Sequence, residues 1–125
     1  MSSYQDLMVY KKSYEAAKTM YKLVNSVMPR EEMFGLTSQI KRASTSIPLN
    51  IAEGYAKNSG KAETIRFLQM ALGSTAEMSV LINMIYDFEY ITEETYRMQT
   101  ETYNEIGKML NALIRTMSEG TTEEN

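Results

Sequence analysis

The sequence predicts an all-α protein that folds as an antiparallel, up-and-down four-helix bundle. Three observations predict this fold class. Apolar residues recur at spacings of three and four through four long segments, short breaks separate these segments, and no stretch alternates as a strand does. Four helices with short connections pack as an up-and-down bundle. The length of 125 residues is typical of a single domain.

The first helix is predicted from about residue 4 to about residue 28. Its apolar stripe consists of Tyr10, Tyr14, Ala17, Tyr21, Val24 and Met28. Ser3 and Asp6 have the spacing of a capping box, and Pro29 ends the helix because the residue before a proline is driven out of helical geometry. We expect the tyrosines to be structural, with packed rings and hydroxyls that reach the rim of the core.

The second helix contains a proline in the middle of its pattern. Its inner stripe consists of Leu36, Ile40, Ala43, Ile47, Ile51 and Tyr55. Pro48 removes one backbone hydrogen bond and clashes with the preceding turn, at a cost of about 3 kcal/mol. Because the stripe is uninterrupted, the sequence favours one helix that is kinked at Pro48 over two shorter helices. Gly60 and the polar residues before it form the next turn.

The third helix, about residues 61–88, is apolar around most of its circumference. Two apolar sets lie on nearly opposite sides, Phe67, Ala71, Met78, Leu81 and Ile85 on one and Ile65, Leu68 and Leu72 on the other. A helix that is apolar all round is either central or covered by a second chain, and a four-helix monomer has no central helix. The pattern therefore indicates self-association.

The fourth helix is predicted to begin at Thr92, a good N-cap residue. Its apolar stripe consists of Tyr96, Tyr103, Ile106, Leu110, Leu113 and Met117. Residues 1–117 are therefore expected to form one four-helix bundle domain. Residues 118–125 are polar and acidic, and we predict that they form a disordered tail.

The composition excludes most catalytic machinery. The chain has no Cys and no His, so it lacks a thiol nucleophile, an imidazole base and the Glu-x-x-His motifs of di-iron bundles. Glu53 and Glu77 are the acids in the middles of the second and third helices, and both are predicted on outer or flanking positions. We expect no enzyme activity, no catalytic residues, no metal, no cofactor and no small-molecule substrate.

Charge is unevenly distributed along the chain, although the net charge is only −3. Residues 36–66 carry five cations and two acids, whereas residues 77–125 carry three cations and ten acids. A basic zone can neutralise phosphates. The candidate nucleic-acid contacts are Lys41, Arg42, Lys57, Lys61 and Arg66. The same cations are also compatible with an ordinary solvated surface.

Two stripes flank the inner face of the second helix, and each is a candidate subunit interface. The polar stripe consists of Gln39, Arg42, Ser46, Asn50, Glu53 and Lys57. The second stripe is dominated by small side chains and consists of Lys41, Thr45, Pro48, Ala52 and Ala56. Small residues allow close approach of a neighbouring backbone, and polar side chains can set register between subunits. The sequence does not decide between these stripes, and the polar one could equally face water.

One long run resembles a known family signature. Phe34-Gly-Leu-Thr-Ser-Gln-Ile-Lys-Arg-Ala-Ser-Thr-Ser-Ile-Pro-Leu-Asn-Ile-Ala-Glu-Gly-Tyr55 closely resembles the four-helix-bundle proteins encoded by intervening sequences in bacterial 23S rRNA genes, which are often labelled ribosomal proteins. Further similar runs begin at Asp6, Arg66 and Ile106. The resemblance extends from about residue 4 to residue 117.

The resemblance implies a ring-like homopentamer of up-and-down bundles without catalytic residues. It also implies distant similarity to the accessory protein of diversity-generating retroelements, a basic pentameric barrel that binds nucleic acid and the reverse transcriptase. This chain departs from the pattern in two ways. Asp87-Phe-Glu-Tyr-Ile91 stands where the family usually has a Gly that ends the third helix, and the chain is net acidic.

Taken together, these observations predict a non-catalytic, homo-oligomeric bundle, a pentamer by resemblance, that binds structured RNA or a ribonucleoprotein. The alternative is a protein–protein interaction scaffold with a polypeptide partner and no nucleic-acid binding, which the acidic balance favours. We expect a cytoplasmic location and no membrane association, because the start lacks a signal-peptide pattern and no window approaches about 20 apolar residues.

Overall fold

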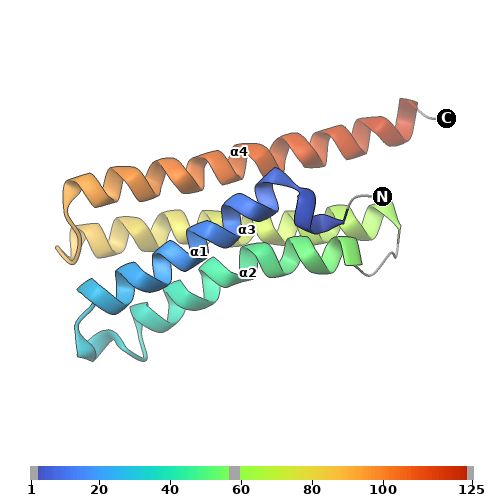
Figure 1. Ribbon diagram of the computed structural model, residues 1–125. Coiled ribbons are helices and arrows are strands. Elements are labelled where there is room, and N and C mark those ends of the chain that lie inside the picture. Colours follow the sequence, from blue (N-terminus) through green and yellow to red (C-terminus); the bar gives the residue numbers. More distant parts are fainter. Residues whose placement is uncertain (1–2, 57–59, 124–125) are drawn as a thin grey trace.

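The computed structural model describes residues 3–56 and 60–123, and in them the predicted fold class is confirmed. The long helices are α1 (Met8–Val27), α2 (Leu36–Ala56), α3 (Lys61–Asp87) and α4 (Glu93–Glu123), and successive helices run antiparallel (Figure 1). The short 3-10 helix η1 (Tyr4–Asp6) precedes α1, and η2 (Arg30–Glu32) precedes α2. No strand occurs within the described residues.

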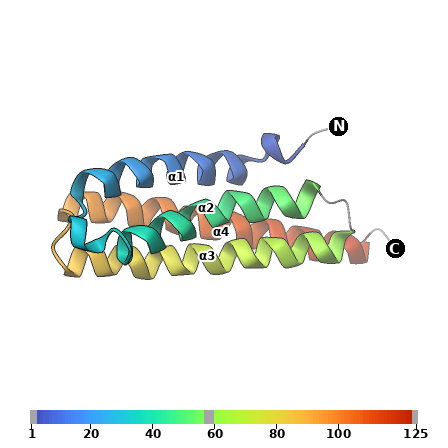
Figure 2. The ribbon, with the colours of Figure 1, turned by 90° about the horizontal axis from the view of Figure 1, so that it is seen from below.

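The four helices contribute to one hydrophobic core. The most extensive contacts join α2 to α3 and α3 to α4, whereas α1 packs on α2 and less extensively on α4. In the described residues no Cα atom of α1 lies within 8 Å of a Cα atom of α3, so these two helices occupy diagonal corners of the bundle, as Figure 2 shows. In the part of the chain that the structure describes, no helix has the length and apolar character needed to cross a membrane.

The start of α1 differs from the sequence prediction. The Ser3 hydroxyl accepts a hydrogen bond from the Gln5 N–H at 3.3 Å and so caps η1, while Leu7 is extended and separates η1 from α1. The inner face of α1 is also rotated relative to the predicted stripe, and its buried residues are Val9, Ser13, Ala16, Ala17, Met20 and Val24. The predicted core position of Tyr14 and Tyr21 is therefore wrong.

Helix α2 continues without a break through Pro48, as the uninterrupted apolar stripe predicts. Five of the six predicted core residues, all but Tyr55, are buried: Leu36, Ile40, Ala43, Ile47 and Ile51. The hydroxyls of Ser44 and Thr45 donate to the carbonyl of Lys41 at 3.2 and 2.8 Å. The kink at Pro48 stays a prediction, and the predicted turn residues 57–59 lie outside the described residues.

Helix α3 ends in a motif that the sequence pattern leaves unspecified. Glu89 has a φ of 66°, in the left-handed region that favours glycine. Its N–H donates to the carbonyl of Tyr86 at 2.9 Å, and the N–H of Tyr90 donates to the carbonyl of Ile85 at 2.8 Å. This pair of hydrogen bonds defines a Schellman motif with glutamate at the position that glycine usually occupies. The helix is thus capped without glycine, at the cost of backbone strain at Glu89.

We expect Glu89→Gly to stabilise the protein by about 1 kcal/mol, because glycine adopts this conformation without the penalty that a Cβ incurs. Glu89 is exposed, so the substitution removes little packing. Urea denaturation followed by circular dichroism measures the difference. Glu94→Gly, at an exposed position in the first turn of α4, is the matched control and should destabilise. Equal losses in both variants would contradict the strain at Glu89.

Helix α4 begins as predicted but ends later. The Thr92 hydroxyl accepts a hydrogen bond from the Thr95 N–H at 3.1 Å, which confirms the expected N-cap. The helix continues to Glu123 instead of ending near Met117. Residues 118–123 are therefore helical, in place of the disordered tail predicted for residues 118–125. No proline interrupts this segment, and Ser118 and Glu119 are exposed on the helix. Residues 124–125 lie outside the described part.

Candidate nucleic-acid interface

The structure does not bring the predicted nucleic-acid contacts together in one patch. Lys41 and Arg42 lie in the N-terminal part of α2, whereas Lys61 and Arg66 lie at the start of α3. Because α2 and α3 are antiparallel, these two pairs lie toward opposite ends of the bundle. Lys57 lies outside the described residues. The four described cations therefore form two separate groups.

The cations also differ in their surroundings. Arg66 donates to Glu63 at 2.6 and 3.1 Å, and this hydrogen bond raises the pKa of the guanidinium above its ordinary value. Arg42 donates to Glu77 across the α2–α3 junction at 3.5 Å. Lys41 instead places its Nζ 4.9 Å from the centre of the Tyr21 ring. Arg66 is thus paired with a neighbouring carboxylate at an exposed position, whereas Lys41 lies against an aromatic ring.

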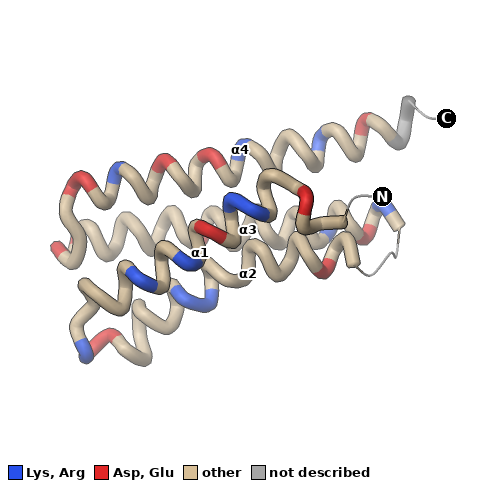
Figure 3. Tube along the Cα trace, viewed as in Figure 1, with Lys and Arg blue, Asp and Glu red and all other residues tan. Residues whose placement is uncertain are grey.

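Lysines of α1 extend the group that contains Lys41. Helix α1 carries four lysines and one glutamate, and Figure 3 shows basic residues along α1 and the adjacent part of α2, with acidic residues frequent along α4. We define the basic edge as Lys11, Lys18, Lys22 and Lys41. The sequence signal for it is the spacing of seven and four between the three α1 lysines, which places them near one side of a helix.

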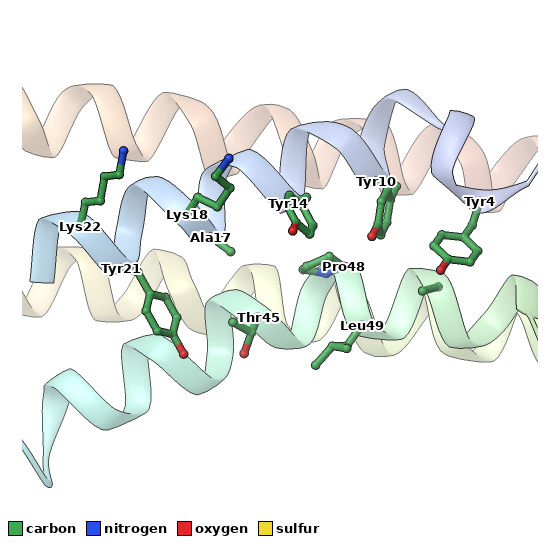
Figure 4. Close-up of a pocket in the computed structure, with 11 residues that line it drawn as sticks. Tyr4, Tyr10, Tyr14, Ala17, Lys18, Tyr21, Lys22, Thr45, Pro48 and Leu49 are labelled. Atoms are coloured by element: carbon green, nitrogen blue, oxygen red, sulfur yellow. The ribbon is translucent and has the colours of Figure 1, made fainter. Parts of the chain in front are cut away.

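A groove between α1 and α2 lies beside the basic edge. We define the tyrosine groove by the residues that line it: Tyr4, Tyr10, Tyr14, Ala17, Lys18, Tyr21, Lys22, Thr45, Pro48, Leu49 and Ala52. Its volume is about 650 Å³. Figure 4 shows the tyrosine rings projecting from η1 and α1 toward α2, while the two lysines project away from α2. The groove is therefore aromatic and aliphatic inside, with cations at one rim.

The tyrosines of the groove form a connected series. Tyr4 and Tyr10 meet edge to face with ring centres 5.0 Å apart, and the Tyr10 and Tyr14 ring centres are 5.9 Å apart. Tyr14 and Tyr21 remain 49% and 39% exposed, so their rings are accessible from the groove. Burial, and then the neighbouring Tyr4 and Tyr14 hydroxyls, raise the pKa of Tyr10. Its phenol therefore stays neutral at physiological pH.

The small-residue stripe of α2 faces α1 of the same chain. Thr45, Pro48 and Ala52 line the tyrosine groove, and Pro48 is buried. Ala56, at the end of the stripe, is exposed. Small side chains in α2 thus leave room for the tyrosine rings of α1. A role of this stripe between subunits stays a prediction.

The polar stripe of α2 faces α3. The Ser46 and Ser74 hydroxyls are hydrogen-bonded at 2.8 Å, and the Asn50 amide donates to the Ser46 carbonyl and hydroxyl at 2.9 and 3.0 Å. Gln39 and Glu53 are exposed along the same stripe. The stripe therefore contributes a hydrogen bond between two helices within the chain, and its role between subunits also stays a prediction.

The outward face of α3 exposes large apolar side chains. We define the α3 stripe as Met70, Gly73, Val80 and Met84, which recur at helical spacing. Met70, Val80 and Met84 are 45%, 57% and 37% exposed, while the inward face of α3 is buried in the core. These exposed residues are not the predicted second side, which is Ile65, Leu68 and Leu72, because Leu68 is fully buried and Leu72 packs against the core.

The described residues contain no arrangement of acids that would hold a metal ion: residues 3–56 and 60–123 include no group of three or more suitable ligands. Glu77 forms its ion pair with Arg42 instead of facing another carboxylate across a cleft. Tyr103 is buried in the core, and its hydroxyl has no hydrogen-bond partner among the residues that the structure describes. That burial raises the pKa of Tyr103, so the group stays neutral.

These features define a class of protein, an up-and-down four-helix bundle with an aromatic groove and a basic edge between its first two helices. The chain belongs to the family described as 23S rRNA-intervening sequence protein, whose profile matches residues 5–112. The family expected from the resemblance is therefore confirmed.

A solved structure agrees with this assignment. The chain is similar to a protein of unknown function from the S23 ribosomal protein family of Bacteroides thetaiotaomicron VPI-5482, with 31% identity and a TM-score of 0.79. The similarity covers 86% of this chain and 96% of that one. No curated protein matches the sequence significantly.

Proposed function

We propose that the protein is a non-catalytic, homo-oligomeric bundle that binds RNA, or RNA within a ribonucleoprotein, through the α1–α2 side of each subunit. The observation that carries this proposal is the basic edge. Lys18 and Lys22 line one groove and Lys41 lies against its Tyr21 ring, while the one acid of α1, Glu15, pairs at 3.6 Å with Lys18 at an exposed position. Such exposed pairs are weak and are exchanged readily for phosphate contacts.

The family supports the choice of ligand class. Membership associates the chain with intervening sequences of 23S rRNA, although it specifies no activity. The related structure likewise belongs to a protein of unknown function. An RNA-binding role accounts for the accumulation of cations on one side of a chain whose net charge is −3. Its place of action would be the cytoplasm, where ribosomal RNA is found.

Self-association is the second part of the proposal. The α3 stripe exposes three large apolar side chains on one outward face, with Val80 and Met84 one turn apart and Met70 further along the helix, and exposed apolar surface marks interaction sites. A repeated heterologous contact closes a cyclic ring, and the resemblance points to five subunits. Light scattering at micromolar protein should give a mass near a pentamer of the 14.3-kDa chain. A monomer at this concentration would eliminate the ring.

The RNA proposal is tested by equilibrium binding of a 23S rRNA fragment and an unrelated structured RNA across a salt series. We expect affinity to fall steeply with salt because phosphate contacts release counterions. Lys22→Gln with Lys41→Gln should weaken binding to both RNAs. If both lysines bind phosphates, replacing each one should also reduce the slope of log K against log salt by about one.

The matched control for that pair is Lys108→Gln with Arg115→Gln, which removes two exposed cations from α4. This control should leave the affinity and the slope nearly unchanged. Equal loss of affinity in both double variants would indicate attraction by overall charge instead of the basic edge. Absence of binding at low salt would refute the RNA role and favour the alternative, a scaffold with a polypeptide partner.

A further inference from the structure

We propose that the tyrosine groove binds an unpaired segment of RNA, whose bases stack on the tyrosine rings while the lysines of the basic edge contact its phosphates. The inference rests on the proposed RNA-binding function and specifies the form of RNA that the groove accepts. Proteins that bind single strands combine a cationic track with aromatic side chains on which successive bases stack. The α1–α2 side of this protein has both parts next to each other.

The aromatic part is suited to bases because its rings are accessible and held in place. Tyr14 and Tyr21 are about half and two-fifths exposed, at 49% and 39%. Tyr10 supports Tyr14 from the other side, with ring centres 5.9 Å apart. Buried Pro48 and neighbouring Thr45 form the opposite wall, so the rings are bounded by α2 and do not project freely into water.

The cationic part is positioned to reach phosphates of a strand in the groove. Lys18 and Lys22 line the groove from α1, and Lys41 lies on its α2 side with its Nζ 4.9 Å from the Tyr21 ring centre. Lys18 Nζ lies 6.0 Å from the Tyr14 ring centre. Each exposed ring therefore has an ammonium group close to it, and this pairing matches the alternation of base and phosphate along a strand.

The length of the groove fits a short unpaired segment. Tyr10 and Tyr21 are 11 residues apart on α1, which corresponds to about 16 Å along the helix axis. Successive phosphates in one strand of a regular helix are about 3.4 Å apart along its axis, so the groove spans a few nucleotides. A double helix would keep its bases inside the stack and could present only its backbone to the tyrosine rings.

An apolar peptide and a second copy of the chain are the competing occupants of such a groove. Two features favour RNA over them. The described residues that line the groove include two lysines and no acid, and one lysine accompanies each exposed ring. A purely apolar partner would leave these ammonium groups without an anionic contact.

The experiment compares three fluorescently labelled probes in equilibrium titrations of the full chain: a 12-nucleotide oligouridylate, an RNA duplex of the same length, and inorganic polyphosphate. The variant is Tyr14→Ala with Tyr21→Ala, and Tyr14→Phe with Tyr21→Phe keeps the rings without the hydroxyls. Phe88→Ala, which removes an aromatic ring that is 51% exposed outside the groove, is the matched control.

We expect the alanine pair to weaken oligouridylate binding roughly 5- to 150-fold for each base that loses its stacked ring, while duplex and polyphosphate binding change by less than about twofold. The phenylalanine pair and Phe88→Ala should bind like the unmodified chain. The chain has no Trp, so its emission comes from tyrosine. Oligouridylate should quench this emission in the unmodified protein and quench it less in the alanine pair.

Several outcomes would overturn the inference. If the duplex and polyphosphate bind but the alanine pair leaves oligouridylate affinity unchanged, the groove does not stack bases, and the RNA-binding role of the basic edge survives. If the alanine pair weakens the binding of all three probes equally, the tyrosine rings only hold the lysines of the basic edge in place and do not stack on bases. If the alanine pair changes the mass in light scattering but not RNA affinity, a second copy occupies the groove. If no probe binds, the proposed function itself fails.

Discussion

Gly54→Ala should lower the free energy of unfolding by about 2 kcal/mol, although alanine normally improves a helix. A Cβ at Gly54 would lie 2.8 Å from the Cβ of Phe67 and 3.4 Å from the carbonyl oxygen of Thr64. These atoms belong to or adjoin the α3 backbone, so α2 and α3 would have to separate. Overpacking of this kind costs roughly 1–3 kcal/mol. Urea denaturation followed by circular dichroism measures the change.

The matched control is Gly107→Ala, at another helix-interior glycine. A Cβ there would lie 3.8 Å from Thr75 Cγ2 and 4.0 Å from Leu72 Cδ1, which is ordinary van der Waals contact. This variant should gain about 0.5–1 kcal/mol, because alanine loses less backbone entropy on folding than glycine. The same substitution therefore has opposite signs at the two positions. A stabilised Gly54→Ala variant would show that α2 and α3 are not held at this close approach.

Close approach at Gly54 is linked to a buried hydrogen bond between the two helices. The Thr64 hydroxyl donates to the Gly54 carbonyl at 2.9 Å, and Thr64 is itself buried. The glycine belongs to the run on which the family resemblance rests. Gly54 thus has a structural role within that signature, because a residue without a Cβ permits the tight contact between α2 and α3 at the end of the bundle where the chain reverses.

The sequence predicts the helices well where apolar residues are aliphatic. Ile40, Ile47 and Ile51 are predicted in the core of α2, and all three are completely buried. In α1 the same reasoning selects Tyr10, Tyr14 and Tyr21, because tyrosine counts as apolar in a periodic pattern. The actual inner face also includes smaller residues outside the predicted stripe, such as Ser13 and Ala16, which let α1 approach the bundle. Periodicity alone does not distinguish these neighbouring faces.

The site is less predictable than the fold because it depends on which helices become neighbours. Lys18 and Lys22 are distant in sequence from Lys41, and only the packing of α1 on α2 places them around one groove. Counting charges by segment instead grouped Lys41 with Lys61, which lies on a different helix toward the other end of the bundle. Segment totals describe charge along the chain, whereas binding depends on charge across a surface.

The two proposed surfaces lie on different parts of the bundle. The tyrosine groove lies between α1 and α2, whereas the α3 stripe belongs to the helix diagonal to α1 (Figure 2). Contacts made through α3 therefore need not bury the lysines of α1. In a ring, each subunit would add one basic groove, and several grooves engaged by one RNA would strengthen binding beyond the affinity of a single site.

We expect Val80→Glu to dissociate the oligomer while leaving the subunit folded. Val80 is 57% exposed in the described chain, so a glutamate there is solvated in the isolated subunit and changes its stability by less than about 0.5 kcal/mol. At an interface between subunits the same carboxylate would be buried without a partner, at a cost that rises steeply with desolvation. Light scattering should then show the mass of one 14.3-kDa chain instead of the assembly.

Met98→Glu provides the matched control, because Met98 is 59% exposed and lies on α4 outside the α3 stripe. This variant should keep the mass of the unmodified protein, and both variants should retain their helical circular dichroism. Dissociation by Met98→Glu alone would move the interface to α4. If neither substitution changes the mass of an assembled protein, the α3 stripe is not buried between subunits, because a carboxylate cannot be buried there without a large loss of association energy.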